Sequence, residues 1–161
     1  MQDAYKSIRE ALYQAGTYND HKTVLTFINS ENLTDENIAE KLAGQDGIVI
    51  CPGFGQRGIE GKVVAAKYTR THNIPTFGIC LGMHSIVTQF ARRNGYPEAN
   101  SSEFDSENPH PVIDMMEEQK KEYQDYVKEI TPTHNTPRNI FRSFWTGGTV
   151  CVIGRQYNAE P

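Results

Sequence analysis

The stretch Thr76-Phe77-Gly78-Ile79-Cys80-Leu81-Gly82-Met83-His84 decides the fold of this chain. A short apolar run ends at Cys80, and a helical pattern of apolar residues at positions 83, 86, 87 and 90 begins just beyond it. The stretch therefore predicts a strand, a sharp turn and a helix, with the cysteine thiol at the turn. Glycines on both sides of the cysteine permit a tight turn and the close approach of a ligand.

The predicted position of Cys80 suits a nucleophile. At the N-terminus of a helix, unpaired N–H groups and the helix dipole favour thiolate over thiol. The backbone N–H of Leu81 can also donate to an oxyanion that forms when the thiolate attacks a carbonyl carbon. A small buried cysteine that closes a strand would give the same pattern. Taken alone, this stretch leaves both interpretations open.

A second segment, residues 47–62, reads GIVICPGFGQRGIEGK and predicts a strand, a glycine-rich loop and a helix. The two segments together resemble the class I, or triad-type, glutamine amidotransferase domain of the CTP synthase family. That family usually reads close to PGGFGxRGxEGK and then FGICLGMQ. Residues 3–8, 99–104 and 112–120 also look like this family, so the resemblance covers residues 3–120 with almost no gaps. The RGIEGK loop disfavours other class I amidotransferases, such as the one in GMP synthase.

The resemblance implies a glutaminase that supplies ammonia from glutamine for the amination of UTP to CTP. It implies that Cys80 is the nucleophile and that the backbone N–H groups of Gly53 and Leu81 form the oxyanion hole. Glu103 suits the charged α-amino end of glutamine, and His84 stands where the family usually has Gln. The implied glutamine pocket consists of Gly53, Phe54, Leu81, Gly82, Met83, His84 and Glu103.

The catalytic base of the family has no counterpart in this sequence. The family carries it in a His-x-Glu pair near the end of the domain, and no His-x-Glu occurs here. His110 and His134 follow Cys80, but each lies among prolines and asparagines, where an ordinary loop histidine is the simpler interpretation. The strand that precedes the family's first helix and the family's synthetase domain have no counterpart either. We therefore expect a partial amidotransferase domain over residues 1–120 and a tail without family resemblance over 121–161. The alternative function is a catalytically incomplete remnant that acts only as a binding module.

Cofactors and partners follow from the resemblance alone. We expect no cofactor and no metal within this chain, because ATP and Mg²⁺ belong to the absent synthetase domain and GTP is the family's effector. The expected partners are L-glutamine, the synthetase domain of the full-length enzyme and further copies in a homo-oligomer, which in the family is a tetramer.

Composition excludes several classes of function. The 161 residues are one domain's worth, and a net charge of −4 gives no basic surface for nucleic acid. No run approaches the roughly 20 apolar residues that a membrane span needs. The three cysteines are widely spaced without a C-x-x-C, so neither a disulfide framework nor a zinc site is indicated. These features favour a reduced, cytoplasmic protein.

The order of elements predicts the fold class. Expected strands cover 24–28, 47–50, 76–79, 141–145 and 149–153; expected helices run from 3 to 16, from 34 onward, and over 60–71, 81–93 and 115–130. Alternating strands and helices indicate an α/β fold: a three-layer parallel sheet with helices on both faces, flavodoxin-like but incomplete. The strands at Val49 and Ile79 should lie side by side or nearly so. The missing first strand should leave a gap near the middle of the sheet, which residues 149–153 could fill.

Overall fold

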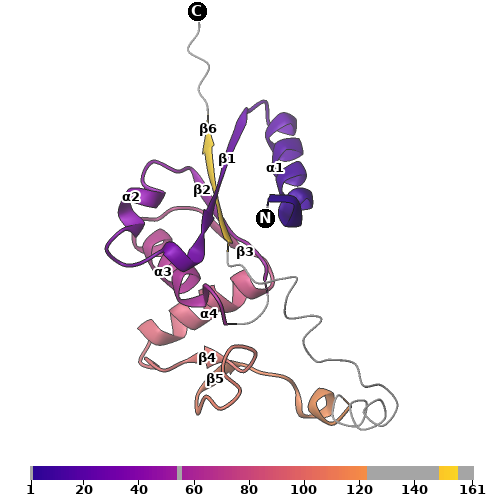
Figure 1. Ribbon diagram of the computed structural model, residues 1–161, viewed down its shortest axis with the longest axis vertical. Helices are drawn as coiled ribbons and strands as arrows, with labels where there is room; N and C mark the ends of the chain where they lie inside the picture. The colour runs from indigo at the N-terminus through magenta and orange to yellow at the C-terminus, as the bar shows by residue number, and fades with distance from the viewer. Residues whose placement is uncertain (1, 54–55, 123–148, 156–161) are drawn as a thin grey trace, which may run out of the picture.

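A four-stranded sheet with the order β1-β6-β2-β3 forms the centre of the molecule (Figure 1). The computed structural model describes residues 2–53, 56–122 and 149–155. The strands of this sheet are β1 (Thr23–Asn29), β2 (Gly47–Ile50), β3 (Thr76–Gly78) and β6 (Thr149–Arg155). A second sheet pairs β4 (Asn100–Ser101) with β5 (Pro111–Ile113) below α4 in Figure 1. The helices are η1 (Gln2–Tyr5), α1 (Lys6–Tyr18), η2 (Ser30–Asn32), α2 (Ile38–Leu42), α3 (Ile59–Thr71) and α4 (Leu81–Arg93).

Helices cover both faces of the four-stranded sheet, as the three-layer α/β class requires. Side chains alternate along a strand, so β2 sends Ile48 and Ile50 to one face and Val49 to the other. The first face packs against α2, α3 and α4, and the second against η1 and α1. The predicted fold class is confirmed, and β2 and β3 are parallel neighbours with Val49 opposite Phe77.

Strand β6 fills the expected gap, since it lies between β1 and β2 and pairs with both. The expectation of a wholly parallel sheet needs correction here, because β6 is antiparallel to both neighbours. Alternation of strands and helices fixes direction only for strands joined by a crossover, as β2 and β3 are through α3. A strand presents alternate side chains to the two faces in either direction, so the residue pattern of β6 does not reveal its direction.

Other boundaries shift for local reasons. Helix α1 continues past Gly16 to Tyr18, and α2 begins at Ile38 because residues 34–37 form a turn in which the Thr34 carbonyl accepts from the Asn37 N–H. Residues 117–122 of the expected helix 115–130 are helical. The remainder of that helix and the expected strand 141–145 lie outside the described residues.

Gly61, the second glycine of the RGIEGK loop, is required by packing. A Cβ at this position would lie 1.7 Å from the Ser30 carbonyl oxygen of η2, so only glycine lets α3 approach η2 this closely. The loop and helix after β2 are thereby held beside the end of β1.

The described helices do not include one with both the length and the apolar character that crossing a bilayer requires. Among the described residues no group of three or more His, Cys, Asp or Glu side chains is arranged to hold a metal ion.

Because β6 is central, truncation of its buried side chains should destabilise the protein more than truncation at the edge. Val152 is 1% exposed and Val24, on β1, is 42% exposed. We expect Val152→Ala to lower the free energy of unfolding by about 2 kcal/mol through lost burial and a residual cavity. Val24→Ala, the matched control, should change it by less than about 0.5 kcal/mol. Urea denaturation measures both, and equal effects would contradict the central placement of β6.

Candidate functional site

Cys80 lies at a strained turn between β3 and α4. Its φ of 53° is in the left-handed region, which residues with a Cβ adopt at a cost of about 1–3 kcal/mol. The Ile79 N–H donates to the Ile50 carbonyl at 3.0 Å, which holds the turn against the end of β2. The thiol is exposed, and the Met83 and His84 N–H groups donate to the Cys80 carbonyl as α4 begins. The interpretation as a buried cysteine that closes a strand is therefore wrong.

Close packing fixes this turn in place. Leu81 is 1% exposed, and a Cβ on Gly82 would lie 2.0 Å from the Ile50 carbonyl oxygen. The first turn of α4 thus lies directly against the carboxyl end of β2. Glycine at position 82 is what permits this contact, and the contact places Cys80 beside the loop that follows β2.

Gly53, the first predicted oxyanion donor, is buried in that loop. Because β2 and β3 are parallel neighbours, Gly53 and Cys80 follow strands that end at the same edge of the sheet. Within the described residues, no group accepts a hydrogen bond from the Gly53 N–H or from the Leu81 N–H. Neither N–H group is thus already occupied by an acceptor in the described part of the chain, as a donor to an oxyanion requires. Phe54 lies outside the described residues.

Lys62 of α3 contacts this loop from the buried face of the helix. Its side chain is fully buried, and its Nζ donates to the Cys51 carbonyl at 2.7 Å and to the Pro52 carbonyl at 3.4 Å. Burial lowers the pKa of Lys62 to about 8, and nearby Cys51 and Cys80 act against that shift. Lys62 is thus mainly protonated at neutral pH. Tyr5 Oη also donates to the Pro52 carbonyl, at 3.3 Å.

His84 and Glu103 meet beside the first turn of α4. The His84 Nδ1 lies 3.5 Å from Glu103 Oε2 and 3.2 Å from Ser101 Oγ. Phe104 brings Glu103 to this place because it packs against Leu81 in a small buried cluster. The structure therefore brings together two residues of the predicted glutamine pocket, one helical turn from Cys80. Met83 is 46% exposed at the start of the same helix.

Charged residues of the RGIEGK segment form ion pairs with the elements around the site. Arg57 Nε lies 2.6 Å from Oε1 of Glu31, a residue of η2. Glu60 accepts two hydrogen bonds from the Arg92 guanidinium, at 2.8 and 3.0 Å, and Arg92 Nε also donates to the Ala99 carbonyl. These contacts link α3, α4 and the segment that leads to Glu103.

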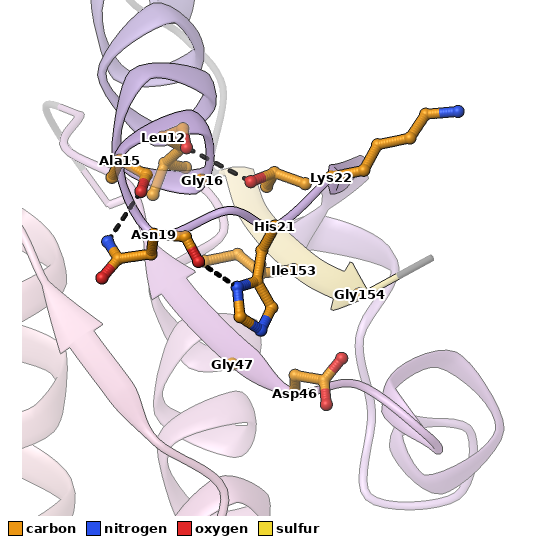
Figure 2. Close-up of a pocket in the computed structure, with 11 residues that line it drawn as sticks. Leu12, Ala15, Gly16, Asn19, His21, Lys22, Asp46, Gly47, Ile153 and Gly154 are labelled. Carbon is orange, nitrogen blue, oxygen red and sulfur yellow. Dashed lines mark hydrogen bonds between the residues drawn. The ribbon is translucent and has the colours of Figure 1, made fainter. Parts of the chain in front are cut away.

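A cavity lies at the opposite end of the sheet (Figure 2). It measures about 550 Å³ and is lined by α1, the amino ends of β1 and β2 and the carboxyl end of β6. In Figure 2 the Lys22 side chain extends away from it, and His21 Nδ1 faces the Asn19 carbonyl. Cys80 and Gly53 are at the other edge of the sheet, so this cavity is separate from the predicted site.

Comparison with known proteins gives the family. The profile described as "Glutamine amidotransferase class-I" matches residues 1–153. The chain belongs to the class I glutamine amidotransferases. The CTP synthase of Bacteroides thetaiotaomicron is 68% identical to this amidotransferase over 121 residues, 74% of this chain and 22% of that protein. The CTP synthase of Bacteroides fragilis is 62% identical over the same length, 23% of its own chain.

A solved structure supports the same fold. The Trypanosoma brucei CTPS glutaminase domain with bound acivicin matches this amidotransferase with a TM-score of 0.67 and 36% identity, over 71% of this chain and 45% of that chain. The chain spans less than a quarter of the length of the curated CTP synthases. The predicted roles of Cys80, Gly53, Leu81 and Glu103 stay predictions, since these likenesses cover the fold and the family and not individual residues.

Sequence reasoning missed Lys62 and Tyr5. The signal was present: Lys62 stands between Ile59 and Ala66 on the buried face of α3, where a solvated lysine does not belong. Tyr5 precedes α1 on the face that carries Ile8 and Leu12. The contacts that these side chains make with the Pro52 carbonyl depend on tertiary packing.

Cys80 should be the most reactive of the three thiols. Burial raises the pKa of Cys51 to about 12 and that of Cys151 to about 11, and both side chains are fully buried. We expect iodoacetamide at pH 7.5 to modify Cys80 at least about 100-fold faster, because thiolate and access are both needed. Peptide mapping by mass spectrometry after timed quenching measures the order. Equal labelling of all three thiols in a folded sample would contradict the turn described above.

Lys62 should make stability depend on pH. A lysine with a depressed folded-state pKa binds fewer protons folded than unfolded between about pH 8 and pH 10.5, so its contribution to stability rises with pH over this interval. Relative to Lys62→Met, the native chain should gain about 3 kcal/mol of unfolding free energy across it. Cys51 and Cys151 act oppositely above pH 9, and taking the difference between the two proteins removes most of their effect. Parallel curves for the two proteins would show that Lys62 titrates normally.

Proposed function

We propose that this chain is the glutamine amidotransferase part of a CTP synthase, with Cys80 as the nucleophile that attacks the side-chain amide of glutamine. The observation that carries the proposal is the exposed Cys80 thiol on a strained turn at the N-terminus of α4. Buried Gly53 follows β2, the strand adjacent to β3, and the two strands end at the same edge of the sheet. The alternative of a remnant that only binds is not favoured by the family match, which extends from residue 1 to 153.

The proposed reaction begins with attack of the Cys80 sulfur on the γ-carbonyl carbon of glutamine. A C–S bond forms and the carbonyl oxygen becomes an oxyanion, which the N–H groups of Gly53 and Leu81 stabilise. The amide nitrogen of the intermediate then takes up a proton, the C–N bond breaks to release ammonia, and a glutamyl thioester remains. In this proposal the Glu103 carboxylate accepts from the substrate's α-ammonium group, and His84, 3.5 Å from Glu103, donates to the substrate or to Glu103.

Proton transfer is the step for which the sequence supplies no residue. The sequence contains no His-x-Glu. His84 does lie 3.5 Å from a glutamate, Glu103, but both residues belong to the proposed glutamine pocket. General acid–base catalysis contributes about 10²–10⁴-fold to such reactions. We therefore infer that this chain alone forms the thioester slowly and clears it more slowly still.

The rest of CTP synthesis belongs to the proposed full-length enzyme. Ammonia would pass to a synthetase domain for the amination of UTP, and ATP, Mg²⁺ and the effector GTP would be bound outside the described residues. Assembly with that domain in a tetramer, and a cytoplasmic location, are proposals that rest on the likeness to CTP synthases.

Ammonia release from glutamine at neutral pH tests the proposal. We expect the chain to release about one equivalent in a slow phase and then nearly stop, because the thioester is not hydrolysed at a useful rate. Cys80→Ala should release none. Sustained, Cys80-dependent turnover would show that another group acts as the base. Loss of that turnover in His110→Gln, His134→Gln or His84→Gln would identify it.

Acivicin, which is bound to the Trypanosoma brucei domain, tests the substrate pocket. Glu103→Gln removes the charge that would pair with the α-ammonium of a glutamine analogue. The acivicin concentration for half-maximal labelling of Cys80 should rise by about 10- to 100-fold. Glu107→Gln, an exposed neighbour on the same segment, is the matched control and should behave as the native chain. If acivicin labelled the two variants equally, Glu103 would not be part of the glutamine pocket.

A further inference from the structure

The Pro52–Gly53 peptide is held by two donors that reach it from opposite faces of the sheet. Lys62 comes from α3 on one face and Tyr5 from the residues before α1 on the other. Both donate to the Pro52 carbonyl, and Lys62 Nζ also donates to the Cys51 carbonyl at 2.7 Å. Lys62 is fully buried and Tyr5 is 5% exposed, so neither side chain is free to move away into solvent.

The direction of the Gly53 N–H follows from this arrangement. The Pro52 carbonyl and the Gly53 N–H belong to one planar trans peptide, in which the C=O and N–H bonds point in opposite directions. When Lys62 and Tyr5 hold the oxygen toward the interior, the N–H is held pointing outward. A positive charge on the carbonyl side also polarises the peptide and strengthens its N–H as a donor.

We propose that Lys62 and Tyr5 are positioning residues for the oxyanion hole: they orient the Pro52–Gly53 peptide so that the Gly53 N–H meets the oxyanion formed at Cys80. The inference rests on the proposed glutaminase function. It explains why a lysine occupies the buried face of α3, where its ammonium has two backbone carbonyls as its described partners. Neither residue touches substrate, so each acts through Gly53.

A pair of electrophiles separates this role from a purely structural one. With the γ-4-nitrophenyl ester of glutamate, the Cys80 thiolate forms a C–S bond to the γ-carbon through an oxyanion, and the C–O bond breaks to release 4-nitrophenolate. That leaving group departs as an anion and needs no proton, so the missing base does not interfere. Iodoacetamide reacts by displacement of iodide at a saturated carbon, where no oxyanion forms. The ratio of the two rate constants at one pH cancels the fraction of Cys80 present as thiolate.

We expect Lys62→Met to lower this ratio by about 10- to 100-fold, less than the full loss of an oxyanion donor. Tyr5→Phe should lower it by about 3-fold, since the neutral hydrogen bond to the Pro52 carbonyl is lost. Lys67→Met, an exposed lysine of the same helix, and Tyr13→Phe, an exposed tyrosine of α1, should leave the ratio unchanged.

The outcomes are distinguishable. An unchanged ratio in Tyr5→Phe and in Lys62→Met overturns the positioning role, and so does an equal fall in the Lys67→Met control. If Lys62→Met does not fold, as circular dichroism would show, Tyr5→Phe decides alone. A nitrophenolate burst that persists in Cys80→Ala overturns the glutaminase proposal itself, whatever the ratios of the other variants.

Discussion

The pairing of β6 with both β1 and β2 is the interaction on which the rest of the structure depends. A strand at this place closes two backbone ladders at once, and its side chains enter both cores: Val150 and Val152 on the face of α3, Cys151 on the face of α1. Without it, β1 would have no neighbour in the sheet and α1 would lose much of the surface against which it packs. The position of β2, and of the loop that follows it, is therefore set by a segment far away in the sequence.

The candidate site is built around the carboxyl end of β2. Gly82 brings the first turn of α4 against the Ile50 carbonyl, and Cys80, just before it, has a positive φ and is exposed. Such strain persists only where surrounding packing holds it, and here buried Leu81 and Phe104 supply that packing. Lys62, buried on α3, reaches the loop after β2. The proposed nucleophile and the loop of the proposed oxyanion hole are thus positioned largely by buried contacts.

The proposed reaction needs residues that bind and activate glutamine and a residue that transfers protons. This chain offers candidates mainly for the first task. The proposed nucleophile Cys80 and the proposed donor Gly53 follow β3 and β2, and Glu103 lies on the segment after α4. The expected base would follow that segment. In the proposed mechanism, capture of a glutamine-like electrophile is therefore faster than release of the product, because hydrolysis of a thioester needs an oriented base.

The sequence by itself determined the local elements that carry chemistry. The apolar run into Cys80, the helical spacing after it and the glycine-rich segment after Ile50 predicted β2, β3, α3 and α4 nearly to the residue, because short-range periodicity and turn chemistry specify them. The end of α1, the start of α2 and the direction of β6 were not specified in this way. Only the tertiary structure decided that β6 runs antiparallel between β1 and β2, that His84 meets Glu103, and that Lys62 and Tyr5 share the Pro52 carbonyl. Each of these depends on which distant segments share a sheet face or a core, and neither side-chain alternation along a strand nor helical spacing contains that information.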